Sequence, residues 1–320
     1  MSYSNIVFLL HGFLGNPKNL EKIKAEFDLI GKSTIVYVLQ DNAGEKSLDG
    51  LEICSTRAVA EIARFLISLG RSPRTVSFIG HSWGGLLLRM VCSKLNWSAL
   101  ELTPKMLITM QTPHMGICTT DLLYNLTQHW IVTRSDSLSV KEMQLNDADT
   151  LQNCMLYKMA MPEFSSSLSR FPTKIHISVH EDYVVRACSA AMGQSMNYVG
   201  SSINQNGWAV LSSDFPGLSS ELQSDMRPPF SHHELSANNS YPGMIACETC
   251  MCTVPIVLRR MVQNNIAPGW NTIWLGTCMK SQILAHLFTI DVTPTGEDIP
   301  TRFAPTLVGI FNYVMDKSKK

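Results

Sequence analysis

The sequence predicts an α/β fold in which a mostly parallel β-sheet is covered by helices on both faces. Short runs of β-branched and aromatic residues alternate with longer amphipathic segments through the first part of the chain. One such run leads through the pentapeptide Gly80–Gly84 into an apolar helical segment. The chain has 320 residues, which is enough for one large core, so we predict a single domain over residues 1–320.

The elements follow from these patterns in order. β-branched and aromatic runs predict strands at Ile6–Leu10, Thr34–Leu39, Thr75–Ile79, Lys105–Met110 and Lys174–Val179. Apolar residues at helical spacing predict helices at Pro17–Phe27, Leu51–Leu69, Gly85–Val91, Thr119–Trp130, Ser139–Met159 and Ile299–Met315. Residues 200–279 are rich in Ser, Asn, Gly and Pro and show no clear period. We interpret this range as an insertion, a cap or substrate loops, in the C-terminal half of the chain.

Composition excludes some classes of partner. Lys plus Arg and Asp plus Glu both number 26, so there is no basic field to attract nucleic acid. Nine cysteines, an odd number scattered mostly through apolar segments, indicate reduced thiols. With no secretory signal expected at residues 6–10, this favours a cytoplasmic protein.

The strand, the G-x-S-x-G sequence at 80–84 and the following helix together predict a nucleophile elbow with Ser82 at its tip. A serine hydroxyl is too weakly acidic to attack a carbonyl unaided, so it needs a base and a group that orients the base. In hydrolases of this topology the partners follow in the order Ser, acid, His.

Asp182 is the predicted acid, because it lies in the loop after the strand that ends at Val179. Glu181 and Asp214 are its rivals. Three histidines follow Asp182 in the chain, namely His232, His233 and His286. We favour His286 as the base, since it comes late in the chain, over the adjacent pair in the insertion.

The oxyanion hole needs backbone N–H groups beside the serine. Trp83, the residue after the nucleophile, should supply one, and Phe13 or Leu14 in the loop after the first strand should supply the other. We also expect Leu14, Trp83 and His114 to contact the substrate. His114 precedes Asp182 and is a poor candidate for the base.

Several segments resemble the serine esterase family with a lipase-like α/β-hydrolase domain, found in eukaryotic cytosolic proteins. They are His11–Asn16, Gly80–Leu86, Thr112–Gly116, Gln144–Asp147, Asp182–Val185 and Ala285–Leu287. The resemblance covers residues 5–195 well and the remainder only around His286. Trp83 and Val185 depart from it, standing where leucine and proline are common.

The resemblance implies an α/β-hydrolase fold and hydrolysis of carboxylic esters of lipids. A thioesterase or acyltransferase could use the same residues, and a non-catalytic scaffold that binds lipid or a partner protein is the alternative from another class. A lipid substrate would bring the protein into peripheral contact with a membrane, although no basic amphipathic helix marks such a surface. We expect no cofactor and no metal, because the cysteines at 247, 250 and 252 with His232 and His233 lack two pairs at zinc spacing.

Overall fold

The computed structural model describes residues 4–29, 33–70, 73–117, 134–179, 182, 184–185, 187–192, 208–215, 261, 269–277, 286–290 and 303–317. These residues contain one seven-stranded sheet with the strand order β2-β1-β3-β4-β5-β7-β6. All neighbouring pairs are parallel except β6 and β7. The strands are β1 Asn5–Leu10, β2 Thr34–Val38, β3 Thr75–His81, β4 Thr103–Met110, β5 Thr173–Val179, β6 Trp208–Ser213 and β7 Asn271–Thr277.

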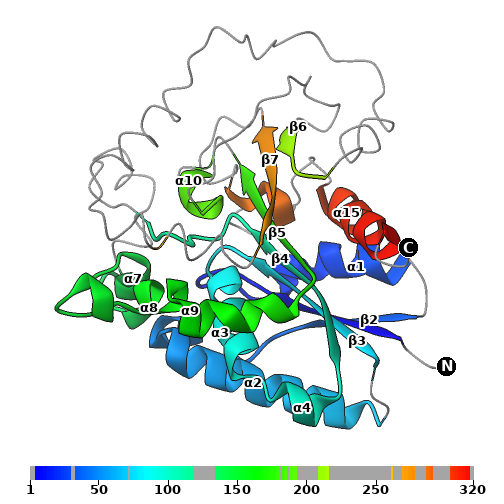
Figure 1. Cartoon of the computed structure of the whole chain (residues 1–320), viewed down its shortest axis with the longest axis horizontal. Helices are drawn as coiled ribbons and strands as arrows, with labels where there is room; N and C mark the ends of the chain where they lie inside the picture. The colour runs from blue at the N-terminus through cyan, green and yellow to red at the C-terminus, as the bar shows by residue number, and fades with distance from the viewer. Residues whose placement is uncertain are drawn as a thin grey trace, which may run out of the picture.

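Helices cover both faces of this sheet, as Figure 1 shows. The α-helices of the described residues are α1 Glu21–Leu29, α2 Leu51–Ser68, α3 Trp83–Lys94, α4 Trp97–Leu100, α7 Leu138–Met143, α8 Met155–Ala160, α9 Pro162–Ser165, α10 Ala187–Ala190 and α15 Phe303–Lys317. Short 3₁₀ turns lie at Pro17–Leu20, Gly44–Asp49, Leu151–Asn153, Ser166–Arg170 and Phe288–Ile290. None of the helices in the described ranges has both the length and the apolarity needed to cross a bilayer.

The strand β1 explains why the sheet needs two covering layers. Its side chains alternate between the two faces, so that Ile6 and Phe8 belong to the core under α2 and α3, while Val7 and Leu9 belong to the core under α1 and α15. All four side chains are buried. A strand that is buried on both faces reads as a continuous apolar run, which is how this strand appears in the sequence.

Most of the predicted elements are present within one to three residues at each end. The predicted helix over Ser139–Met159 is wrong as a single helix, because α7 ends at Met143 and Leu145 then takes a positive φ of 56°. A residue in that conformation cannot continue a right-handed helix, and the rest of the predicted range holds only the 3₁₀ turn Leu151–Asn153 and α8. The helix predicted over Thr119–Trp130 lies outside the described residues.

The predicted insertion over 200–279 needs a correction at both ends. Two strands of the sheet, β6 and β7, lie within that range. β7 is a short run buried between β5 and β6, and β6 is an edge strand whose partner follows it by about 60 residues. Neither strand shows alternation long enough to stand out among the surrounding turn residues. Between the two strands only residues 214–215, 261 and 269–270 are described, so the predicted cap falls largely outside the described residues.

The aromatic contact that joins α1 to α15 gives a stability prediction. Phe27 is fully buried, and its ring meets the Phe311 ring edge-on at a centroid distance of 5.0 Å. Phe27→Ala should therefore lower the free energy of unfolding by about 3–5 kcal/mol in chemical denaturation. Leu29→Ala is the matched control on the same helix, because Leu29 is 79% exposed and its loss should cost less than about 0.5 kcal/mol. Equal losses for the two variants would contradict this account of the core.

Candidate active site

Ser82 lies at a sharp turn between β3 and α3. Its backbone has φ 53° and ψ −130°, a strained conformation for a residue other than glycine. The Ser82 N–H donates to the Met110 carbonyl at 2.8 Å, which continues the β3–β4 ladder by one residue. The side chain is thereby presented at the carboxyl end of the sheet and at the N-terminus of α3, where the helix dipole favours a developing negative charge.

The glycines around Ser82 are required by close packing. A Cβ atom on Gly80 would lie 2.7 Å from the Gly85 backbone nitrogen. A Cβ on Gly84 would collide with the His11 carbonyl, and one on Gly85 with the Thr112 side chain. The strand and the helix can therefore approach closely enough to form the turn only without side chains at these positions.

The structure brings Ser82, His286 and Asp182 together. His286 Nε2 lies 2.9 Å from Ser82 Oγ, and His286 Nδ1 lies 2.7 Å from Asp182 Oδ2. A carboxylate can only accept, so Nδ1 carries the proton and the Nε2 lone pair accepts the serine O–H. All three residues are buried, with 7%, 5% and 2% of Ser82, His286 and Asp182 exposed. A hydroxyl, an imidazole and a carboxylate in this order have the geometry of nucleophilic catalysis.

Asp182 is fixed by several donors. Its Oδ1 accepts from the backbone N–H groups of Val184 and Val185 at 2.9 and 3.0 Å. Its Oδ2 accepts from Gln111 Nε2 at 2.9 Å in addition to His286. Of the rival residues, Asp214 instead accepts from the Thr272 N–H at 2.7 Å, beside β7, and Glu181, His232 and His233 lie outside the described residues.

His81, the residue before the nucleophile, holds the backbone that carries the base. Its Nε2–H donates to the His286 carbonyl at 3.0 Å. Burial lowers the pKa of His81 to about 3, and the neighbouring His286 adds to this, so its ring is neutral at physiological pH. A neutral imidazole can therefore lie beside His286, at a ring centroid distance of 5.0 Å, without repelling the charge that His286 would acquire.

The loop after β1 lies against the nucleophile. A Cβ atom on Gly12 would come within 3.1 Å of Ser82 Cβ, so the backbone of the loop packs directly against the Ser82 side chain. Leu14 has a positive φ of 54°, and its N–H donates to Ser47 Oγ at 2.9 Å. The Leu14 N–H is therefore bound in this structure, and Leu14 is one of the two alternatives, Phe13 or Leu14, predicted as the oxyanion donor of this loop.

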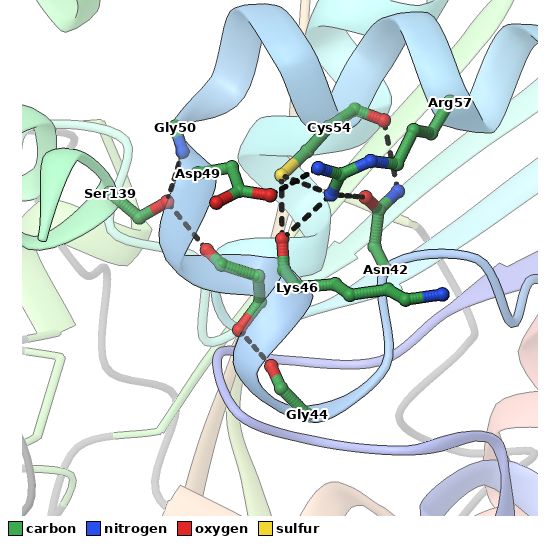
Figure 2. Close-up of polar contacts among 9 residues, drawn as sticks. Asn42, Gly44, Lys46, Asp49, Gly50, Cys54, Arg57 and Ser139 are labelled. Carbon is green, nitrogen blue, oxygen red and sulfur yellow. Dashed lines mark hydrogen bonds and ion pairs between the residues drawn. The ribbon is translucent and has the colours of Figure 1, made fainter.

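Ser47 connects the loop to the helical layer. Its Oγ donates to the Gly44 carbonyl at 2.7 Å, and its own carbonyl accepts from Ser139 Oγ at 2.6 Å. Ser139 Oγ in turn accepts from the Gly50 N–H at 3.0 Å. Figure 2 shows these bonds beside the contacts of Arg57 with Asn42, Lys46 and Asp49. The Arg57 contacts hold the 3₁₀ turn Gly44–Asp49, which contains Ser47, against α2.

Two residues predicted to contact the substrate, Trp83 and His114, have fully buried side chains. Trp83 is fully buried among the apolar residues under α3. His114 is also fully buried, with its Nδ1 accepting from Arg89 at 3.2 Å and its Nε2 bonded to Thr109 Oγ1 at 2.9 Å. Burial, together with the Arg89 charge, lowers the pKa of His114 well below its usual value, so it is a neutral structural residue. Leu14 is half-buried and stays a candidate contact.

Sequence reasoning missed Gln111, His81 and Ser47. Gln111 could have been found, because it is a polar residue directly after a buried strand, at the edge where the parallel strands end. His81 stands beside the nucleophile, but nothing in the sequence shows that it reaches a backbone group 205 residues away. No signal exists for Ser47, whose contact with Leu14 depends on how two loops pack. The cysteines weighed as zinc ligands lie outside the described residues.

The sheet order, the turn at Ser82 and the chain order of Ser82, Asp182 and His286 define an α/β-hydrolase. The chain belongs to the family described as "Putative serine esterase (DUF676)", whose pattern matches residues 2–195. Asp182 lies inside the matched range and His286 outside it.

Solved α/β-hydrolase structures are also similar to the chain. The RedJ thioesterase from the prodiginine biosynthetic pathway of Streptomyces coelicolor is 17% identical, with a TM-score of 0.34, over 58% of this chain and 73% of the thioesterase. Aspergillus fumigatus lipase B is 15% identical, with a TM-score of 0.40, over 58% of this chain and 39% of the lipase.

The space around each glycine predicts how an added methyl group changes stability, and Gly80 and Gly309 should respond in opposite directions. Gly80→Ala should destabilise the protein by about 3 kcal/mol, because the new methyl would overlap backbone atoms of Gly84 and Gly85. Gly309→Ala, in α15, should stabilise it by about 0.5–1 kcal/mol, since nothing lies within 4 Å of the added Cβ. Thermal or urea unfolding measures both. A neutral Gly80→Ala variant would contradict the tight turn.

Proposed function

We propose that the protein is a lipase-like serine esterase that hydrolyses carboxylic esters through an acyl-enzyme on Ser82. The observation that carries this proposal is the hydrogen-bonded series Ser82 Oγ, His286 Nε2 and His286 Nδ1, Asp182 Oδ2. Membership of a family described as a serine esterase supports the same reaction class.

The first half of the reaction forms the acyl-enzyme. His286 Nε2 takes the proton of Ser82 Oγ while this oxygen attacks the ester carbonyl carbon. Asp182 accepts from Nδ1–H and stabilises the imidazolium. The tetrahedral intermediate then collapses, the alkoxide leaves with the proton from His286, and the acyl group stays on Ser82. In the second half a water molecule gives a proton to His286 Nε2 and attacks the acyl carbon. The bond between the acyl carbon and Ser82 Oγ then breaks, Oγ takes the proton back from His286, and the carboxylic acid is released.

Backbone N–H groups would bind the oxyanion. Trp83 is the first residue of α3, and the N–H of such a residue has no acceptor within its own helix. The second donor is proposed from the loop after β1, where Phe13 and Leu14 are the alternatives and the Leu14 N–H donates to Ser47 in this structure. Each donor of this kind contributes about 3 kcal/mol to transition-state stabilisation.

Lipid esters are the proposed substrate class. We propose that the protein lies in the cytoplasm and contacts a membrane surface peripherally. The resemblance to lipase-like domains supports the substrate, and the balanced charge of the chain argues against nucleic acid as a partner. Comparing turnover of monoacylglycerol, phospholipid and acyl-CoA separates esterase from thioesterase activity, and an added alcohol acceptor reveals acyl transfer.

Ser82→Ala tests the proposal directly. The substitution removes the nucleophile and leaves the backbone turn in place, so the variant should fold normally and lose p-nitrophenyl ester turnover by at least about 10⁴-fold. The wild-type protein should be labelled on Ser82 by a fluorophosphonate, and Ser82→Ala should not be labelled. A wild-type chain that neither turns over esters nor reacts with the probe would favour a non-catalytic scaffold.

Ser47→Ala tests the loop that carries the oxyanion donor. Without the Ser47 hydroxyl the Leu14 N–H has no acceptor and the strained loop can relax, so we expect kcat to fall by roughly tenfold while KM changes little. Ser55→Ala is the matched control, because Ser55 is a buried serine whose hydroxyl donates to the Glu52 carbonyl within α2. If steady-state kinetics show the same kcat for Ser47→Ala and Ser55→Ala, Ser47 does not hold the site.

A further inference from the structure

Gln111 lies where the segments that carry the three reacting groups meet. It follows the last residue of β4, is fully buried, and has a positive φ of 48° that is strained for a non-glycine residue. Its N–H donates to the Ile177 carbonyl of β5 at 2.8 Å, while the preceding Met110 carbonyl accepts from Ser82. The backbone at this position therefore connects the strand before Asp182 to the turn that presents Ser82.

The two ends of the Gln111 amide contact different parts of the site. Nε2 donates to Asp182 Oδ2 at 2.9 Å, the same oxygen that accepts from His286. Oε1 accepts from the hydroxyl of Thr289, a fully buried residue three positions after His286. One side chain thus bridges the carboxylate and the turn that carries the imidazole.

We propose that Gln111 is a positioning residue of the esterase, which sets both the orientation of the Asp182–His286 pair and the share of the carboxylate charge available to His286. The proposal rests on the proposed function. Gln111 and His286 share Oδ2, and two backbone N–H groups hold Oδ1, so the carboxylate plane cannot rotate. The amide is kept from turning because a turned amide would place Oε1 against Asp182 Oδ2, which can only accept, while Thr289 donates to Oε1 in the observed orientation.

The charge argument predicts the direction of a change in pH dependence. Among the described residues, the titratable side chains that face His286 are Asp182 and His81, and His81 is neutral with a pKa of about 3. Removing the Gln111 donor would leave more negative charge on Oδ2, which favours the protonated form of His286. The base would then be blocked by a proton up to a higher pH. A residue that only fills the core would not have this effect.

Gln111→Met removes both polar ends at nearly constant volume. We expect kcat to fall by roughly 10- to 100-fold with KM within about threefold, because the pair loses its orientation. The acid limb of the kcat/KM profile should move up by roughly half a pH unit. Thr289→Val should move both quantities in the same direction by a smaller amount, and Thr289→Ser, which keeps the hydroxyl, should restore wild-type values.

The coupling between the two residues gives a second readout. Because Thr289 acts through Gln111, the double variant Gln111→Met/Thr289→Val should be no slower than Gln111→Met alone. Thr109→Val is the control on the same strand, since it removes a buried hydroxyl that bonds to His114 and not to Gln111, Asp182 or His286. It should keep the wild-type kcat and pH profile even if it lowers stability.

The proposal is overturned if Gln111→Met keeps the wild-type acid limb and a kcat within twofold, or if the effects of Gln111→Met and Thr289→Val simply add. If Gln111→Met does not fold, the kcat and the acid limb of Thr289→Val are compared with those of Thr289→Ser. Equal values for the two variants overturn the proposal. An NMR titration of His286 in the full chain separates this from failure of the proposed function. A shifted titration in a protein that hydrolyses no ester refutes the esterase and leaves the positioning role standing.

Discussion

The 2.9 Å hydrogen bond between His286 Nε2 and Ser82 Oγ is the interaction on which the rest of the site depends. The two residues are 204 positions apart, so no local preference can bring them together. Their meeting requires that the parallel strands end at one edge of the sheet and that the turn at 286–290 packs over that edge. The polar contacts of His81, Gln111, Val184 and Val185 hold either the backbone of His286 or the Asp182 carboxylate.

The cost of burying these polar groups explains why their surroundings are so fully bonded. A buried carboxylate is stable only when its oxygens have donors, and Asp182 has four within 3.0 Å. The backbone of His286 is bonded through its carbonyl to the neutral ring of His81. Removal from water also strengthens each charged interaction, which is the condition under which an oriented imidazole and carboxylate are most effective.

The environments of Leu14, Trp83 and His114 differ from the sequence-based expectation for one physical reason. Each residue is close to Ser82 in the sequence or follows a strand that ends near it, and each has a side chain or N–H suited to a substrate. Proximity does not determine direction, however. The Trp83 side chain packs into the core beneath α3, His114 joins a buried cluster with Arg89, and the Leu14 N–H is used by Ser47. The sequence alone does not indicate which of these side chains is buried in the core or which N–H already has an acceptor.

The sequence alone determined the sheet-and-helix alternation, the turn at Ser82 and the chain order of nucleophile, acid and base. These follow from local rules, because glycine spacing and runs of β-branched residues act within a few positions. Tertiary structure decided which histidine meets Ser82, that β6 and β7 complete the sheet, and that Gln111 and Thr289 connect Asp182 to the turn of His286. Such contacts join residues tens to hundreds of positions apart, and their geometry exists only once both layers have packed on the sheet.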